Sequence, residues 1–106
     1  MSNLQLVFTT FGSEDEAKRI VLTLVEERLI ACGNITSKVT SIYRWQGKVS
    51  SEIEWAATLK TTEENFEALS RRLKELHPYD VPEIVAIPVA AVSPDYAAWV
   101  AESCKK

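Results

Sequence analysis

The chain contains few of the residues from which metal sites, disulfide frameworks and basic binding surfaces are made. Its 106 residues include two cysteines and one histidine, and acidic residues outnumber basic ones by 15 to 12. Cys32 and Cys104 form neither a CxxC pair nor a Cys/His cluster, so we expect no structural zinc site. The formal net charge of −3 argues against binding to nucleic acid or to an anionic membrane.

Long apolar runs and a basic leader are also missing. No run approaches the roughly 20 apolar residues that span a bilayer, and residues 1–10 do not resemble a signal peptide. We therefore expect a cytoplasmic protein with reduced thiols, folded as one domain over residues 1–106. A domain of this size is marginally stable alone, and burial against other subunits would help it.

Short-range signals mark the first strand and helix. Residues 4–10 are apolar and rich in β-formers, which is typical of a buried strand. Ser13 is a good N-cap for the following helix, and Glu16 completes a capping box. We expect this helix to end near Gly33, because glycine readily adopts the left-handed conformation of a helix cap.

Two further helices are predicted. Thr61 or Thr62 can cap the second helix, and Pro78 both ends it and moves His77 out of the α region. A short C-terminal helix begins at Ser93, an N-cap followed by proline. Its expected apolar contacts are Tyr96, Trp99 and Val100.

A long β-hairpin is predicted around Gly47, which is free to take the positive φ of a tight turn. Before the turn, one face holds Val39, Ser41, Tyr43 and Trp45, and the other holds Thr40, Ile42 and Arg44. After the turn, the face expected to be buried holds Ile53, Trp55, Ala57 and Leu59, and the face expected to be exposed includes Glu52, Glu54, Thr58 and Lys60.

The last predicted strand, residues 81–89, contains Pro82 and Pro88. Proline has no N–H to donate, and two prolines six residues apart face the same edge of a strand. The strand should therefore pair on one flank only and border the sheet. The N–H groups of Glu83, Val85 and Ile87 face the other flank and are free to pair.

The order β-α-β-β-α-β plus a helix predicts an α+β fold. We expect a ferredoxin-like antiparallel sandwich with a C-terminal helix, in which the proline-bearing strand and the hairpin form opposite edges. Nothing in the hairpin blocks its edge with proline, so this tryptophan-bearing ribbon is a candidate for strand pairing between subunits.

Five segments, taken together, resemble the divalent-cation tolerance protein family, CutA. They are ACGN (31–34), SIYRWQGKV (41–49), LKTT (59–62), HPYDVPEIVAIPV (77–89) and DYAAWV (95–100), and the similarity runs from about residue 6 to residue 100. The resemblance implies a ferredoxin-like fold, a homotrimer built by intersubunit strand pairing, and an association with copper and other divalent metals. It also implies similarity to trimeric nitrogen-regulatory signalling proteins, which bind small ligands between subunits.

The chain departs from the family pattern at three positions. Gly33 stands where an apolar β-branched residue is usual. Some members carry copper-ligand candidates at the end of the first strand and beside the HPY histidine, but those positions here hold Thr9 and Leu76. Only His77 of that set remains.

Candidate metal ligands are therefore few. His77 is the only imidazole and can bind a metal or carry a proton, although a histidine at a helix C-terminus also interacts favourably with the helix dipole. The thiolate of Cys32 suits Cu(I), but most free cysteines are small buried apolar residues. A metal such as Cu(II) would need further ligands from elsewhere in the chain or from other subunits.

Four other residues are candidates for a ligand cleft: Tyr79, Glu83, Lys60 and Trp45. Glu83 lies within an apolar strand, where a buried carboxylate would need a partner. Trp45 can pack at an interface or stack on a ligand. Solvated strand ends, surface charges and subunit packing are the alternatives for these residues.

Three functions remain open. The first is a trimeric cytosolic protein that binds copper, another divalent metal or a small ligand at intersubunit clefts. The second is an acylphosphatase-like enzyme of the same fold, but residues 9–17, where such enzymes bind phosphate, contain no arginine, and the single histidine leaves no visible nucleophile-base pair. The third is a structural or signalling trimer without a metal function. We expect the first, and no catalysis.

Overall fold

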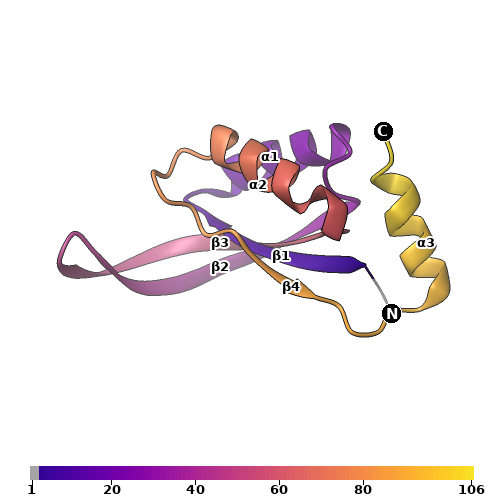
Figure 1. The fold of residues 1–106 in the computed structure, drawn as a ribbon. Coiled ribbons are helices and arrows are strands. Elements are labelled where there is room, and N and C mark those ends of the chain that lie inside the picture. Colours follow the sequence, from indigo (N-terminus) through magenta and orange to yellow (C-terminus); the bar gives the residue numbers. More distant parts are fainter. Residues whose placement is uncertain (1–2) are drawn as a thin grey trace.

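The chain forms a four-stranded antiparallel sheet with helices, as predicted (Figure 1). The computed structural model describes residues 3–106. Its elements are β1 (Leu4–Phe11), α1 (Glu14–Glu26), β2 (Cys32–Trp45), β3 (Lys48–Thr62), a 3-10 turn (Glu63–Asn65), α2 (Phe66–Leu76), β4 (Val85–Pro88) and α3 (Pro94–Ser103). This β-α-β-β-α-β order confirms the ferredoxin-like architecture.

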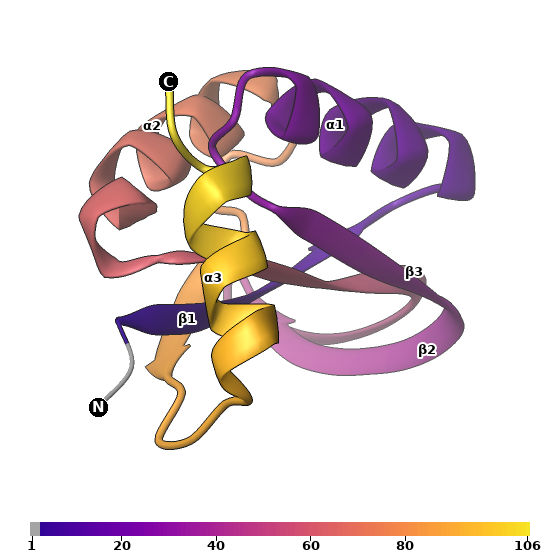
Figure 2. The same cartoon turned by 90° about the vertical axis from the view of Figure 1, so that its right-hand side faces the viewer.

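The sheet has the order β2-β3-β1-β4, and α1 and α2 lie together on one of its faces (Figures 1 and 2). Apolar side chains of both helices pack on the helix-facing side of β1 and β3. This core consists of Val7, Phe11, Ala17, Ile20, Val21, Leu24, Leu29, Ile30, Ala57, Leu59, Leu69 and Leu73. The opposite face of the sheet is not covered by α1 and α2, and α3 stands across one end of it (Figure 2).

Strand β4 borders the sheet, as its prolines require. It pairs with β1, with Ala86 opposite Val7, and the N–H of Val89 donates to the Leu4 carbonyl at 3.0 Å. N–H groups two residues apart in a strand point to the same flank, so the N–H of Val89 lies on the flank of Val85. The strand therefore pairs on the flank that was predicted. The strand is shorter than predicted: it covers only Val85–Pro88, and the segment from Pro82 to Ile84 is irregular.

The prediction for the end of the first helix is wrong. Helix α1 ends at Glu26, Arg28 takes the left-handed conformation with φ 61°, and Gly33 lies inside β2. Gly33 is needed for space rather than for its backbone angles: a Cβ there would lie 2.6 Å from Val21 Cγ1 and 3.0 Å from Leu59 Cδ2. The N-cap prediction is confirmed, since Ser13 Oγ accepts from the N–H of Glu16.

The start of the second helix also differs from its prediction. A 3-10 turn precedes α2, and the side chain of Thr62 makes no capping hydrogen bond. The hydroxyl of Thr61 donates instead to the Leu29 carbonyl at 2.7 Å, tying β3 to the segment after α1. The end is as predicted, because His77 before Pro78 is extended, with ψ 133°.

The hairpin of β2 and β3 turns at Gln46 and Gly47, which have φ angles of 50° and 80°. Its tip extends beyond the two helices (Figure 1). Ile53, predicted to be buried, is 53% exposed because no helix of this chain reaches it, whereas Ala57 and Leu59 are buried as predicted. Glu54, predicted to be exposed, is only 7% exposed.

Helix α3 begins at Ser93, whose hydroxyl accepts from the N–H of Tyr96, and Pro94 is its first residue. Val100 is fully buried against Leu4, Ala31 and Cys104, which confirms it as an apolar contact. Trp99 is 47% exposed and Tyr96 37% exposed, so these two predicted contacts are only partly made within one chain.

Candidate functional site

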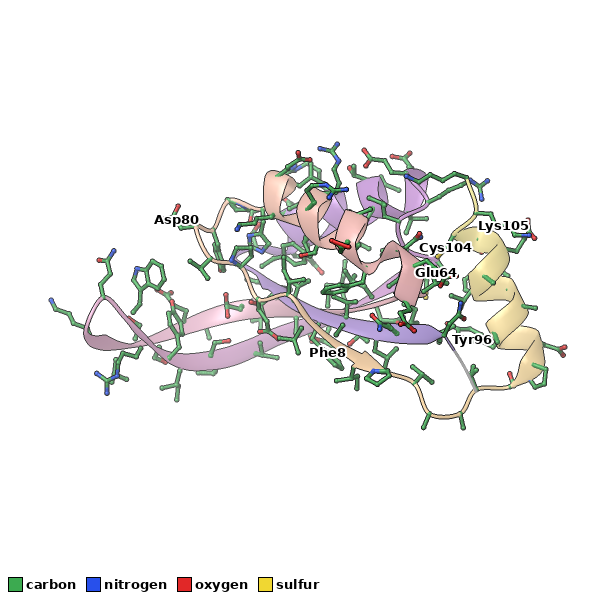
Figure 3. All side chains as sticks on the ribbon, in the orientation of Figure 1. Phe8, Glu64, Asp80, Tyr96, Cys104 and Lys105 are labelled. Carbon is green, nitrogen blue, oxygen red and sulfur yellow. The ribbon has the colours of Figure 1, made fainter. Side chains whose placement is uncertain are left out.

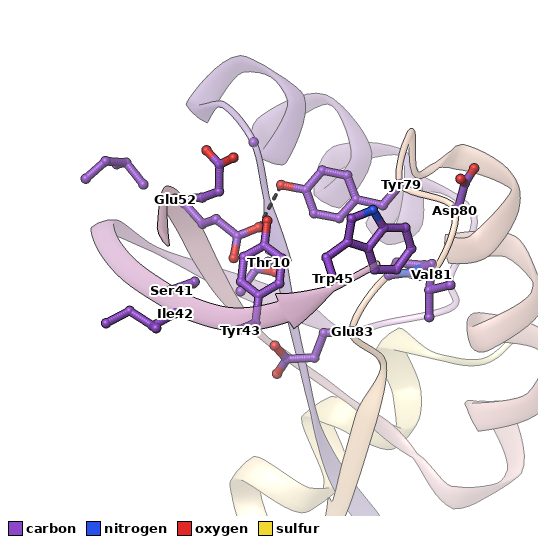
Figure 4. A pocket seen from close by; sticks show the side chains of 14 residues that line it. Thr10, Ser41, Ile42, Tyr43, Trp45, Glu52, Tyr79, Asp80, Val81 and Glu83 are labelled. Carbon is purple, nitrogen blue, oxygen red and sulfur yellow. Dashed lines mark hydrogen bonds between the residues drawn. The ribbon is translucent and has the colours of Figure 1, made fainter. Parts of the chain in front are cut away.

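A cleft of about 890 Å³ lies between the hairpin and the loop that follows α2 (Figure 4). The loop contributes Tyr79 to Glu83, β1 contributes Thr10, and the hairpin contributes aromatic and acidic side chains. The full lining is Thr10, Gly12, Ser41, Ile42, Tyr43, Trp45, Glu52, Ile53, Glu54, Tyr79, Asp80, Val81, Pro82 and Glu83. Three of the four residues predicted for a ligand cleft, Tyr79, Glu83 and Trp45, therefore meet here.

The hairpin register decides which of its side chains face the cleft. Ser41 pairs with Glu52 and Val39 with Glu54, so these residues share the ribbon face of Tyr43 and Trp45. The opposite ribbon face holds Ile42, Val49 and Ile53, which are 71%, 66% and 53% exposed. A β-bulge between Ile35 and Lys38 shifts this register. One ribbon thus carries an acidic, aromatic face and an apolar face.

Tyr79 and Glu54 join the loop to the hairpin. The Tyr79 hydroxyl donates to Glu54 Oε2 at 2.6 Å, the hydrogen bond drawn in Figure 4. A Cβ at Gly12 would lie 3.3 Å from this hydroxyl, so glycine lets the ring approach β1 closely. Burial, followed by the hydrogen bond to the Glu54 carboxylate, raises the pKa of the Tyr79 phenol well above its usual value near 10.

Replacing Tyr79 with phenylalanine is expected to lower the free energy of unfolding by about 1 to 2 kcal/mol at neutral pH, because buried Glu54 loses its donor. The raised pKa means that, above about pH 10, the unfolded chain releases the phenol proton while the native protein keeps it. The stability of the unmodified protein should therefore fall with rising pH in this range, and its advantage over the variant should shrink.

Denaturant unfolding at fixed protein concentration between pH 8 and pH 11 measures this effect. Tyr43→Phe, which removes an exposed phenol from the same cleft, is the matched control. A Tyr79→Phe deficit that stays constant up to pH 11 would show that the phenol is not held protonated by Glu54.

His77 lies beneath the loop that carries Tyr79 and contacts both this loop and β1. It is 6% exposed, and its ring stacks on Phe11 with centroids 4.9 Å apart. Nε2 lies 2.7 Å from the Thr10 carbonyl, and Nδ1 accepts from the N–H of Tyr79 at 3.2 Å. These contacts assign the proton to Nε2 and engage both ring nitrogens. In this arrangement His77 positions Tyr79, and its ring must turn before either nitrogen can bind a metal.

Lys60 and Cys32 lie elsewhere, and neither lines this cleft. The two residues face each other across β3 and β2, and Lys60 Nζ donates to the side chain of Asn34. Cys32 is partly buried, and its Sγ lies 3.6 Å from the Tyr96 hydroxyl of α3. Figure 3 shows Tyr96 on α3 and Asp80 on the loop at the opposite side of the helical layer. The two metal candidates, His77 and Cys32, are therefore not brought together.

The two positions at which the chain departs from the copper-ligand candidates implied by the resemblance, Thr9 and Leu76, are both withdrawn from solvent to different degrees. Thr9 is 1% exposed and lies opposite Ala57 of β3, and Leu76 packs against the core. Within residues 3–106, no three His, Cys, Asp or Glu side chains cluster closely enough to hold a metal ion. No helix in the same range is long and apolar enough to cross a bilayer.

Sequence reasoning missed several cleft residues. The alternating pattern predicts an exposed face for Glu52 and Glu54, and Asp80 and Tyr43 are not among the four residues predicted for a ligand cleft. The composition of the loop could have indicated these residues. The loop carries a tyrosine and two carboxylates beside prolines, and the nearby hairpin also carries aromatic and acidic residues.

The charged side chains that line the cleft are all acidic. Glu52, Glu54, Asp80 and Glu83 line it, and no lysine, arginine or histidine does so. Glu54 accepts from Tyr79, but no basic side chain of the lining neutralises any of the four carboxylates, so the cleft has a negative potential that attracts cations. The aromatic faces of Tyr43 and Trp45, 41% and 44% exposed, add a second surface that attracts positive charge.

Comparison with known proteins agrees with this architecture. Residues 5–103 match the family model of the CutA1 divalent ion tolerance protein. The divalent-cation tolerance protein CutA of Thermus thermophilus is 48% identical over 99 residues, 93% of this chain and 96% of the relative. That of Pyrococcus horikoshii is 46% identical over 101 residues, 95% of this chain and 98% of the relative.

A solved structure shows the same fold. The crystal structure of CutA from Xylella fastidiosa superposes with a TM-score of 0.95 at 36% identity, covering 98% of this chain and all of that one. Both sequence and structure are similar over nearly the whole chain, and the resemblance seen in the five sequence segments is confirmed. This chain belongs to the CutA1 divalent ion tolerance protein family.

Proposed function

We propose that the protein is a homotrimer that binds a positively charged ligand, a divalent metal ion or a small cationic molecule, in the cleft between the hairpin and the Tyr79–Glu83 loop. The observation that carries this proposal is the cleft's lining, which holds four carboxylates and no basic side chain. The names of the relatives, which refer to divalent cations, support a ligand of the same charge.

Association between copies of the chain is supported by two unsatisfied surfaces of the hairpin, and three copies are what the resemblance to the CutA family implies. Strand β2 is an edge strand whose outer flank pairs with no strand of residues 3–106, and the ribbon face opposite Tyr43 and Trp45 exposes Ile42, Val49 and Ile53. An edge strand without proline pairs readily with another strand, and a second copy of the chain offers the matching edge and apolar face. In this assembly the cleft opens beside the subunit boundary.

Light scattering tests the trimer. The native chain should elute with the mass of three protomers at micromolar concentration. Ile42→Asp, which places a charge in the apolar ribbon face, should shift the mass toward one protomer, whereas Glu67→Gln on the exposed side of α2 should not. A native monomer would contradict the proposal.

Calorimetric titration with Cu(II), Zn(II) and Mg(II) tests the metal form of the ligand. We expect Glu83→Gln to weaken binding more than Glu67→Gln, because only Glu83 lines the cleft. Equal binding by His77→Ala and the native protein would show that His77 is not a ligand. Absence of binding by any metal would leave small cationic molecules as the ligand.

A binding role also fits the chemistry that the site lacks. The only histidine has both nitrogens engaged by backbone groups, so it activates no nucleophile within residues 3–106. The family description names ion tolerance and no reaction. We therefore propose a binding protein rather than an enzyme, located in the cytoplasm, where the free thiols of Cys32 and Cys104 stay reduced.

A further inference from the structure

We propose that the cleft takes a linear organic polyamine, whose ammonium groups bind its carboxylates while the methylene spacers lie on its aromatic and aliphatic side chains. This inference rests on the proposed function, because it names the chemical class of the ligand in the same cleft. Three features of the cleft carry it: the spacing of the charges, the rings between them and the volume.

The carboxylates stand apart. Glu52 and Glu54 come from the hairpin, and Asp80 and Glu83 come from the loop on the other side (Figure 4). A metal ion needs several oxygen ligands within about 2.0–2.6 Å of one point, and the side chains of residues 3–106 provide no such cluster of three. Separated negative charges instead match a ligand whose positive charges are separated by a chain.

Aromatic rings occupy the space between the charges. Tyr43 and Trp45 project from the hairpin toward the loop that carries Tyr79 (Figure 4). An ammonium group over such a ring gains about 0.5–1 kcal/mol at an exposed site, and more when it is desolvated. A hydrated metal ion would gain less from these rings, because its water shell keeps it away from them.

Part of the remaining lining is apolar. Val81 and Pro82 of the loop border the cleft, and Val81 is 72% exposed. Aliphatic side chains do not bind a bare ion. They can cover the methylene groups of a polyamine, and each buried CH₂ group contributes about 0.8 kcal/mol to the binding free energy. The volume of about 890 Å³ also lies in the range of small-molecule sites, far larger than one ion requires.

Calorimetric titration of the full chain with spermidine, putrescine and neutral 1,8-octanediol tests the proposal, at about 0.15 M salt to screen non-specific attraction. We expect spermidine to bind more tightly than putrescine, and the diol not to bind. Trp45→Leu and Glu83→Gln should each weaken spermidine binding about fivefold, the equivalent of about 1 kcal/mol. Glu67→Gln, which changes the net charge equally but lies outside the cleft, should leave the affinity unchanged.

The outcomes separate the two proposals. Binding of Cu(II) or Zn(II) that Glu83→Gln weakens, without spermidine binding, would overturn the polyamine and keep the cleft as a cation site. Spermidine binding that Glu67→Gln weakens as much as Glu83→Gln does would show general charge attraction and also overturn it. If neither metals nor amines bind, the proposed function fails as well. Circular dichroism of each variant confirms that it is folded.

Discussion

Replacing His77 with alanine is expected to lower the free energy of unfolding by about 3 to 4 kcal/mol, because the ring is 6% exposed and makes three kinds of contact. The variant loses the stacking on Phe11, the hydrogen bond to the Thr10 carbonyl and the acceptor for the N–H of Tyr79. The Tyr79–Glu83 loop should loosen with it. Denaturant unfolding of metal-free protein at fixed concentration measures the loss.

The same variant distinguishes a structural histidine from a metal ligand. A ligand role predicts unchanged stability without metal and a loss of the stabilisation that added metal gives. A positioning role predicts the stability loss without any metal. His77→Gln is the control, since its side-chain amide can still donate to the Thr10 carbonyl and should recover part of the loss. Equal stability of the native protein and His77→Ala without metal would contradict the structural role.

The architecture could be predicted because local chemistry decided it. Pro88 cannot donate a hydrogen bond, so β4 had to border the sheet. Gly47 fixed the hairpin turn, and the two-residue periodicity of β3 placed Ala57 and Leu59 in the core. These features depend on neighbouring residues, and the sequence shows them directly.

The cleft was predicted only in part, because its contacts join residues far apart in sequence. Tyr79 reaches Glu54 across 25 positions, and alternation along β3 placed Glu54 on a face that is exposed in most strands. Lys60 has the same parity as Glu54 but lies further along β3, beside Asn34. The alternation of residues along a strand therefore predicts which face of the sheet a side chain lies on. It does not predict which residue on that face contacts the loop.

Gly33 illustrates the same limit in the core. As a residue between a helix and a strand it looks like a cap, yet the backbone turns earlier, at Arg28. What requires a glycine is the closeness of Val21 on α1 and Leu59 on β3, and nothing in the local sequence reports that closeness. The position therefore offers a sharp test of how tightly the helix packs on the sheet.

Replacing Gly33 with valine is expected to lower the free energy of unfolding by about 2 to 3 kcal/mol. The new Cβ would lie 2.6 Å from Val21 Cγ1 and 3.0 Å from Leu59 Cδ2, closer than carbon atoms pack, so α1 must move away from the sheet. This cost exceeds the gain from valine's higher β-propensity. Thermal or denaturant unfolding at fixed protein concentration measures it.

A second substitution separates steric crowding from any other effect of removing the glycine. Val21→Ala alone should destabilise the protein, because it opens a cavity in the core. In the double variant the valine side chain at residue 33 fills that space, so the two losses should be less than additive by about 1 kcal/mol or more. Strict additivity would mean that Val21 does not limit this position.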